Sequence, residues 1–142
     1  MKWEDCLDYK IKKVKENPSQ ATALLQLSQR RLEFIEQYGK NDFPQLLVES
    51  YYEVIKELIS ALLAIYGYKS YSHECLVSFI EEYYPSIFDE DQIKFIDSMR
   101  KLRSDIQYRG REIANDYLHR NQTKIITIIN KLNDLVEKEL IQ

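Results

Sequence analysis

The residues best suited to chemistry lie in one basic stretch of this 142-residue chain. Five of its seven arginines fall between positions 100 and 120, namely Arg100, Arg103, Arg109, Arg111 and Arg120. With Lys101 the stretch carries six positive charges against three negative ones, whereas the whole chain has a net charge of -3. Guanidinium groups match phosphate geometry, so the pattern indicates a polyanion site. The alternative is a solvated helix surface with internal ion pairs, such as Asp105 with Arg109.

Within this stretch, positions 99–110 combine the basic residues with a polar pair after Arg103 and a glycine bend. Three apolar side chains are expected to hold the segment against a core, namely Leu102, Ile106 and Ile113. The arginines are then fixed at a defined depth, which phosphate recognition requires. We therefore select as candidate ligand-binding residues Arg103, Ser104, Asp105, Tyr108 and Arg109.

Other catalytic motifs are missing from the sequence. The three glycines are isolated, so there is no glycine-rich phosphate loop, and there is no GxSxG motif. The two histidines, His73 and His119, lie in different predicted elements. A di-iron bundle needs two Glu-x-x-His pairs, and Asp116 with His119 gives one loose approximation. We therefore expect no metal and no cofactor.

His73 and a group of tyrosines each allow two interpretations. His73 follows Ser72 at a predicted helix start, where Ser72 would cap the helix; the alternative is a role in a ligand pocket. Seven tyrosines could stack on bases, but packing in a core or interface is the commoner use of such residues. They are Tyr51, Tyr52, Tyr66, Tyr68, Tyr71, Tyr83 and Tyr84. We favour the structural interpretation in both cases.

Hydrophobic periodicity predicts the helices that position these residues, and it predicts no strand. The main helices are expected at 19–38, 43–66, 72–83, from Asp89 to a bend at Gly110, and at 112–139. The helix 43–66 has the widest apolar stripe and is expected at the centre, ending at Gly67. A further helix is expected at 3–15, within an N-terminal helical extension over 1–17. The predicted fold is an all-α, antiparallel four- to five-helix bundle, forming one domain over 1–142.

Composition limits the class of protein. A hydrophobic content of 44% with 3 Gly and 3 Pro is typical of one compact domain and excludes collagen-like or disordered chains. The longest apolar run, 61–66, is too short to span a bilayer, and no leader pattern opens the chain. Cys6 and Cys75 make no disulfide framework and suit a reducing compartment, although a single bridge stays open. We expect a soluble, cytoplasmic protein without membrane contact.

Around Arg103 the sequence resembles the HEPN family. HEPN domains are compact helical bundles, often dimeric, whose ribonuclease members carry Arg, a polar residue, a few further positions and then His. The match here is Arg103 and Ser104, then 105–107, then Tyr108. The helix order is similar to that of the archaeal branch over roughly residues 18 to 140. The resemblance implies a homodimer whose paired motifs meet at the interface and, in active members, cleave RNA without a metal.

Tyr108 departs from the motif, because it stands where the ribonuclease members have histidine. An unperturbed phenol has a pKa near 10 and is a poor base at pH 7, whereas histidine titrates near neutrality. Lowering a phenol pKa needs nearby positive charge, for which Arg103 and Arg109 are the sources. A phenol can otherwise donate a hydrogen bond to a phosphate oxygen and keep its proton. Arg103 and Tyr108 are therefore catalytic candidates only if the protein is active.

Three functions follow from these patterns. The first is a HEPN-like homodimer that binds RNA or a nucleotide through Arg103, Ser104 and Tyr108 without efficient catalysis. The second is an active, metal-independent endoribonuclease, such as a toxin, in which Arg103 stabilises the phosphorane charge. The third is a non-catalytic partner of another protein, for example of a nucleotidyltransferase, motivated by the acidic remainder of the chain and the near-heptad last helix. The apolar stripes of the last helices also favour a dimer.

Overall fold

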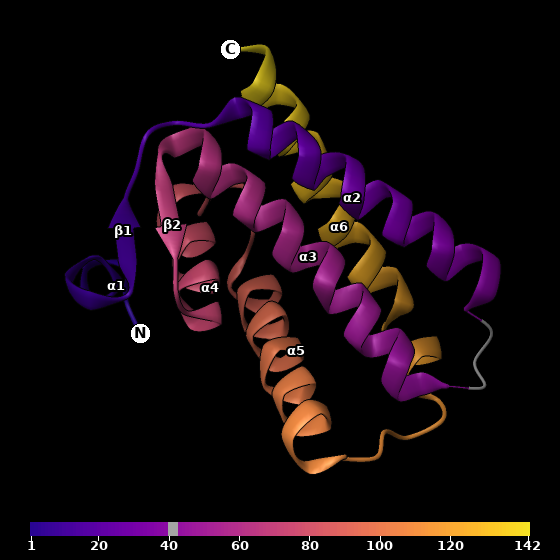
Figure 1. The fold of residues 1–142 in the computed structure, drawn as a ribbon. Helices are drawn as coiled ribbons and strands as arrows, with labels where there is room; N and C mark the ends of the chain where they lie inside the picture. The colour runs from indigo at the N-terminus through magenta and orange to yellow at the C-terminus, as the bar shows by residue number, and fades with distance from the viewer. Residues whose placement is uncertain (40–42) are drawn as a thin grey trace.

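The computed structural model describes residues 1–39 and 43–142, and it is mostly helical (Figure 1). Along the chain the elements are α1 (Trp3–Tyr9), β1 (Ile11–Lys13), α2 (Pro18–Tyr38), α3 (Pro44–Tyr66), β2 (Tyr68–Ser70), α4 (His73–Tyr83), α5 (Glu90–Arg109) and α6 (Tyr117–Ile141). The all-α prediction is confirmed in its broad form, with six helices and one two-stranded sheet among the described residues.

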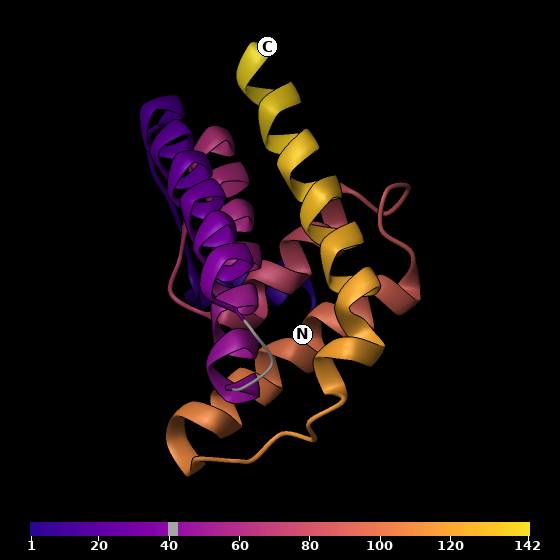
Figure 2. The ribbon, with the colours of Figure 1, turned by 90° about the vertical axis from the view of Figure 1, so that its right-hand side faces the viewer.

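The central element is α3, as its wide apolar stripe predicts. Thirteen of its 23 residues are buried, and it packs against α2, α4, α5, α6 and β2. In both ribbon views α2 runs alongside α3 (Figures 1 and 2). Fully burying one of its aliphatic side chains, such as Ile55 or Leu62, contributes about 1.5–3 kcal/mol. This packing makes α3 a rigid support for the polar residues on its remaining face.

Local signals in the sequence predict several helix ends within one residue. Asn17 caps α2 by accepting a hydrogen bond from the Gln20 N–H at 3.0 Å. Asp89, the predicted start of this helix, forms a capping box with Gln92 at the beginning of α5, with reciprocal bonds of 2.8 and 3.2 Å. Gly67 ends α3 with a φ of 82°, in the left-handed region that favours glycine. These signals act within one turn of helix, so the sequence alone carries them.

The helix predicted at 3–15 is wrong in its second half. The helix α1 ends at Tyr9, and residues 11–13 form β1, which pairs antiparallel with β2 so that Ile11 faces Ser70. Ile11 is buried while the two lysines after it are exposed, and the Tyr71 N–H donates to the Lys10 carbonyl oxygen at 2.8 Å. Ile11 is the only apolar residue of β1, so the spacing of apolar residues does not determine the structure of these three positions, and β2 supplies the partner that stabilises the strand.

A disulfide ties this N-terminal segment to the rest of the fold. It joins Cys6 of α1 to Cys75 of α4, 69 positions further along the chain. Ser78 of α4 also donates a hydrogen bond to the Met1 carbonyl oxygen at 2.6 Å. The structure therefore has the single bridge that the cysteine count left open. Cys6 and Cys75 therefore give no support to a reducing compartment.

The last helix starts later than predicted. Residues 111–116 form a connection rather than the first turns of α6, because Gly110 ends α5 in the left-handed conformation with a φ of 61°. The Gln45 side chain of α3 holds this connection by donating to the carbonyl oxygens of Gly110 and Arg111. The apolar stripe of α6 packs against α3 and α2 within the chain. That stripe therefore no longer argues for a dimer.

Most of the seven tyrosines take part in packing, as the structural interpretation holds. Tyr51, Tyr52 and Tyr84 are buried, whereas Tyr71 is 64% exposed. The ring of Trp3 packs edge-on against aromatic rings from β2 and α4, with centroids 5.4–5.8 Å apart. None of the helices described is both long and apolar enough to cross a membrane.

Candidate functional site

Arg103 lies inside the helix packing rather than on an open surface. It projects from α5 towards α3, where its Nη2 lies 3.5 Å from Oε1 of Glu53, and its side chain is 16% exposed. Ile106 on the same helix is buried and Leu102 packs partly against the core. The predicted fixed depth of Arg103 therefore agrees with the structure. Within residues 1–39 and 43–142 this 3.5 Å contact is its only ion pair, which leaves most of the five guanidinium N–H donors available for another acceptor.

The neighbouring arginines largely pair with carboxylates. Arg100 bonds Asp97 at 2.8 Å, and Arg120 bonds Asp116 at 3.1 Å one turn away. Asp105 pairs with Arg111 at 3.0 Å rather than with Arg109, because the left-handed residue at the end of α5 turns the chain back. The alternative of internal ion pairs thus describes much of this stretch. Exposed pairs of this kind contribute at most about 1 kcal/mol each.

Tyr108 and Arg109 form the exposed end of α5. Tyr108 is 79% exposed, and Arg109 makes no ion pair within residues 1–39 and 43–142. Five positions on a helix correspond to a rotation of about 140°, so Tyr108 faces away from Arg103. Ser104 and Asp105 are intermediate in burial. The structure therefore places Arg103 inward and Tyr108 outward, and the five candidate residues do not converge on one point.

His73 is the neighbour of Arg103 that the sequence did not assign to the site. It is the first residue of α4, and its Nδ1 lies 3.5 Å from the hydroxyl of Tyr52, on which its ring stacks. Burial lowers the pKa of His73, and the charges of Arg103, Lys56 and Arg100 lower it further against the opposing effect of Glu53. The imidazole is therefore neutral at pH 7, and it can accept a proton or a hydrogen bond.

The predicted cap at the start of α4 is only partly correct. Ser72 is the N-cap residue, but its side chain makes no capping hydrogen bond. Instead the Ser70 hydroxyl accepts from the Ser72 N–H at 3.1 Å and donates to the Ser72 carbonyl oxygen at 2.6 Å. His73 also lines a pocket, which agrees with the alternative interpretation of this residue. The only sequence signal for that interpretation was the position of a histidine at a helix start.

We call the six residues around this point the charged cluster: Glu53, Lys56, His73, Asp97, Arg100 and Arg103. Lys56 bonds Glu53 at 2.7 Å, so α3 contributes one pair and α5 contributes another. Burial raises the pKa of Asp97, but hydrogen bonds from Arg100 and Lys101 outweigh burial and leave the pKa below its usual value. Three cations against two carboxylates give the charged cluster a net positive charge while His73 is neutral.

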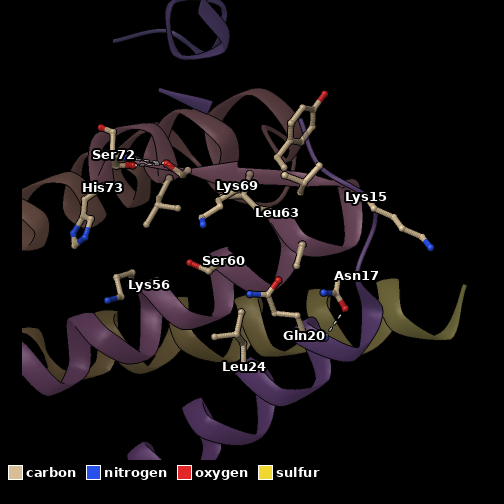
Figure 3. A pocket seen from close by; sticks show the side chains of 15 residues that line it. Lys15, Asn17, Gln20, Leu24, Lys56, Ser60, Leu63, Lys69, Ser72 and His73 are labelled. Atoms are coloured by element: carbon tan, nitrogen blue, oxygen red, sulfur yellow. Dashed lines mark hydrogen bonds between the residues drawn. The ribbon is translucent and has the colours of Figure 1, made fainter. Parts of the chain in front are cut away.

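A pocket of about 600 Å³ opens beside the charged cluster (Figure 3). It lies between α2, α3, β2, the start of α4 and the linker after β1, and Lys56 and His73 belong to both the pocket and the cluster. None of the described residues that line it is acidic. Within residues 1–39 and 43–142 no group of three or more His, Cys, Asp or Glu could hold a metal ion. Cationic and neutral polar groups of this kind suit an anion.

The sequence matches no model of a known protein family, and it matches no curated protein.

Proposed function

We propose that the protein is a HEPN-like helical domain that binds RNA or a nucleotide through the phosphate, without efficient catalysis. The observation that carries the proposal is the position of Arg103 in a cluster of net positive charge. Glu53 contacts one nitrogen of the guanidinium and so orients it. The lowered pKa of His73 keeps its imidazole neutral at pH 7, so the positive charge of the cluster comes from its lysine and arginines. A phosphate there would meet N–H donors that are already positioned.

The exposed end of α5 extends this site towards single-stranded RNA. Tyr108 offers an open aromatic ring, and Arg109 offers a guanidinium without an ion pair in the described chain. Helical rise places Tyr108 about 7.5 Å along the axis from Arg103 but on another face of α5, so RNA that contacts both has to follow the end of the helix from one face to the other. Aromatic stacking combined with cationic contacts is the usual basis for binding single strands.

The weak-catalysis part of the proposal follows from the same geometry. Tyr108 points away from Arg103, so its phenol is not placed to exchange a proton at a phosphate that Arg103 binds. A homodimer, as the HEPN resemblance implies, belongs to the proposal as well. Light scattering should then give about twice the 17.0 kDa mass of one chain. A monomer mass over a wide concentration range would contradict the dimer.

Fluorescence anisotropy with a labelled single-stranded RNA tests the binding. Arg103→Ala should weaken binding about tenfold, because hydrogen bonds to charged groups contribute about 1.5–3 kcal/mol. It should also reduce the slope of log K against log salt by about one. Arg120→Ala, which removes a paired arginine on α6, is the matched control. Binding that ignores salt, or equal losses in both variants, would contradict the proposal and favour the protein-partner hypothesis.

His73 gives specific support to a second candidate, the metal-independent endoribonuclease. In that reaction a base removes the proton of a ribose 2′-hydroxyl, the oxygen attacks the adjacent phosphorus, and the 5′-oxygen leaves with a proton from solvent. His73 is neutral and close enough to Arg103 for the arginine to lower its pKa. Cleavage of a labelled RNA in EDTA should then fall about a hundredfold or more in His73→Gln and in Arg103→Ala. No cleavage by folded wild type removes this candidate.

A further inference from the structure

The pocket beside the charged cluster is built from segments far apart in the sequence. The linker after β1 contributes Val14 and Lys15, α2 contributes its first turns, and α3 contributes Lys56 and Ser60. The linker is fixed by backbone bonds from the Val14 N–H to the Gly67 oxygen at 2.8 Å and from the Asn17 N–H to the Ala64 oxygen at 2.9 Å. The wall of the pocket that the linker forms is therefore in place before any ligand binds.

The pocket gathers three lysines, and the described residues neutralise only part of their positive charge. Lys15, Lys56 and Lys69 line it, and of these Lys56 alone makes an ion pair in the part of the chain that the structure describes. Lys69 lies 5.4 Å from the ring of Tyr71, which provides no charge. In Figure 3 the ammonium of Lys69 points towards α3, on the side of the pocket where Ser60 and Lys56 lie, whereas Lys15 extends outward at the rim.

The sheet beside the pocket adds a second, independent sign of an anion. Lys12 of β1 stands directly opposite Lys69 of β2, and both residues are exposed. Side chains of directly opposed residues lie on the same face of an antiparallel pair, where like charges are destabilising. A bound anion would relieve this repulsion. The starts of α2 and α4 also border the pocket at Asn17 and Ser72, and helix N-termini attract negative charge.

The remaining lining is apolar or neutral and polar in character, so the pocket suits more than a bare ion. Three leucines from three helices are part of it, namely Leu24 of α2, Leu63 of α3 and Leu76 of α4. The Gln20 side chain points into the space in Figure 3, and Asn17 beside it already caps α2 through its oxygen. A volume of about 600 Å³ lies within the range of small-molecule sites, roughly 300–1,000 Å³.

We propose that this pocket binds a small organic phosphate, with the phosphate between Lys56, Lys69 and the start of α4 and the organic part along the leucines. The site goes beyond RNA binding at Arg103, because Lys69 and Ser60 lie outside α5. The same chemistry occurs in a free phosphomonoester and in the 5′-phosphate at the end of an RNA chain. The experiment therefore includes both sources.

Isothermal titration calorimetry with the full chain uses phenyl phosphate, inorganic phosphate and phenol as probes. Phenyl phosphate should bind most tightly, because it satisfies both the cationic and the apolar sides, and phenol should bind least. Lys69→Ala should weaken phenyl phosphate binding about tenfold, and Lys69→Glu should weaken it further. Lys69 is exposed, so both variants are expected to fold. The control is Lys94→Ala, which removes an exposed lysine of α5 outside the pocket.

A short RNA with a 5′-phosphate and the same RNA with a 5′-hydroxyl separate the two sources. Preference for the phosphorylated end that disappears in Lys69→Ala assigns the pocket to RNA ends, whereas tight phenyl phosphate binding without that preference assigns it to free phosphomonoesters. Failure of phenyl phosphate and of the phosphorylated RNA to bind, or equal effects of Lys69→Ala and Lys94→Ala, would overturn the proposal. Arg103→Ala is not expected to abolish phenyl phosphate binding, so this site and the Arg103 site can fail separately.

Discussion

Two basic regions of the molecule differ in how their charge is used. On α5 and in the connection after it the arginines are close in sequence, and Arg100, Arg103 and Arg111 each meet a carboxylate. In the pocket the lysines are scattered along the chain, and Lys15 and Lys69 meet no carboxylate in the described residues. The density of basic residues in the sequence therefore does not predict the positive potential that a ligand encounters in the folded protein. The fold creates a second cationic site from residues that the sequence keeps apart.

The two regions also differ in how they are held. The end of α5 is a helix terminus followed by a connection held through Gln45. The pocket wall is a strand and linker fixed by the β1–β2 pairing, by backbone bonds near Gly67 and by the disulfide through Cys6 and Cys75. Loss of the disulfide should therefore disturb the pocket region while Arg103 stays in place.

The largest effect is expected from the disulfide. Closing a loop between positions 69 apart lowers the entropy of the unfolded chain and stabilises the fold by about 4 kcal/mol. Urea unfolding with and without dithiothreitol measures the loss. Phenyl phosphate binding should weaken under reduction, while RNA binding that depends on Arg103 should persist. The Cys6→Ser, Cys75→Ser double variant should match the reduced protein and ignore dithiothreitol. Equal urea midpoints for the oxidised and the reduced protein would show that the disulfide contributes nothing to stability.

The next effect compares a glycine from each region. Gly67 has a φ of 82°, and an added Cβ would lie 2.8 Å from the Val14 carbonyl oxygen, so Gly67→Ala should cost about 2–3 kcal/mol. Gly110 has a φ of 61° but nothing within 4 Å of such a Cβ, so Gly110→Ala should cost about 1 kcal/mol. Urea unfolding gives both values. Equal losses would mean that the close approach of Val14 contributes nothing.

Local signals explain which parts of this fold the sequence predicts. Asn17, Gly67 and the Asp89–Gln92 box act on their own helix ends, so α2, α3 and the start of α5 follow from them. The strand at 11–13 depends on a partner at 68–70, far along the chain. The disulfide depends on the same juxtaposition. The connection that precedes α6 is held by Gln45 of another helix, a contact that no pattern near position 112 could reveal.

The candidate site shows the same division. The inward position of Arg103 follows from the apolar residues beside it on α5, because both are features of one helix. The outward position of Tyr108 follows from helical geometry as well. The approach of His73 to Arg103 joins two helices, and the gathering of Lys15, Lys56 and Lys69 joins three segments. Such contacts are set by packing around α3, and a single sequence does not encode them in its spacing.

A smaller effect is expected at the exposed end of α5. Stacking of one base on an aromatic side chain contributes about 1–3 kcal/mol, so Tyr108→Ala should weaken RNA binding about fivefold or more. Stability should change by less than about 0.5 kcal/mol, because the ring is 79% exposed. Anisotropy with Tyr108→Phe as control separates stacking from hydrogen bonding, since the phenylalanine keeps the ring. A Phe variant as weak as the Ala variant would assign the effect to the hydroxyl. Phenyl phosphate binding should stay unchanged in both variants.

The smallest effect is a pH dependence at His73, where the two regions meet. The groups that face this imidazole are Arg100 and Arg103 of α5 with Lys56 and Glu53 of α3, and together with burial they lower its pKa in the folded protein. Below the ordinary histidine pKa of 6.5, His73 binds a proton more readily in the unfolded chain than in the folded protein. The contribution of neutral His73 to stability is therefore full above that pH and is lost as the pH falls below it. Urea unfolding from pH 7.5 downward should show the loss, and His73→Gln should remove it.

A bound phosphate should reverse the sign of the effect. It adds negative charge beside His73 and favours the imidazolium, so phenyl phosphate should raise the pKa of His73 and bind more tightly as the pH falls towards 6. An NMR titration of the His73 imidazole measures this directly. If the ligand leaves the His73 titration unchanged, the phosphate does not sit where the pocket and the charged cluster meet.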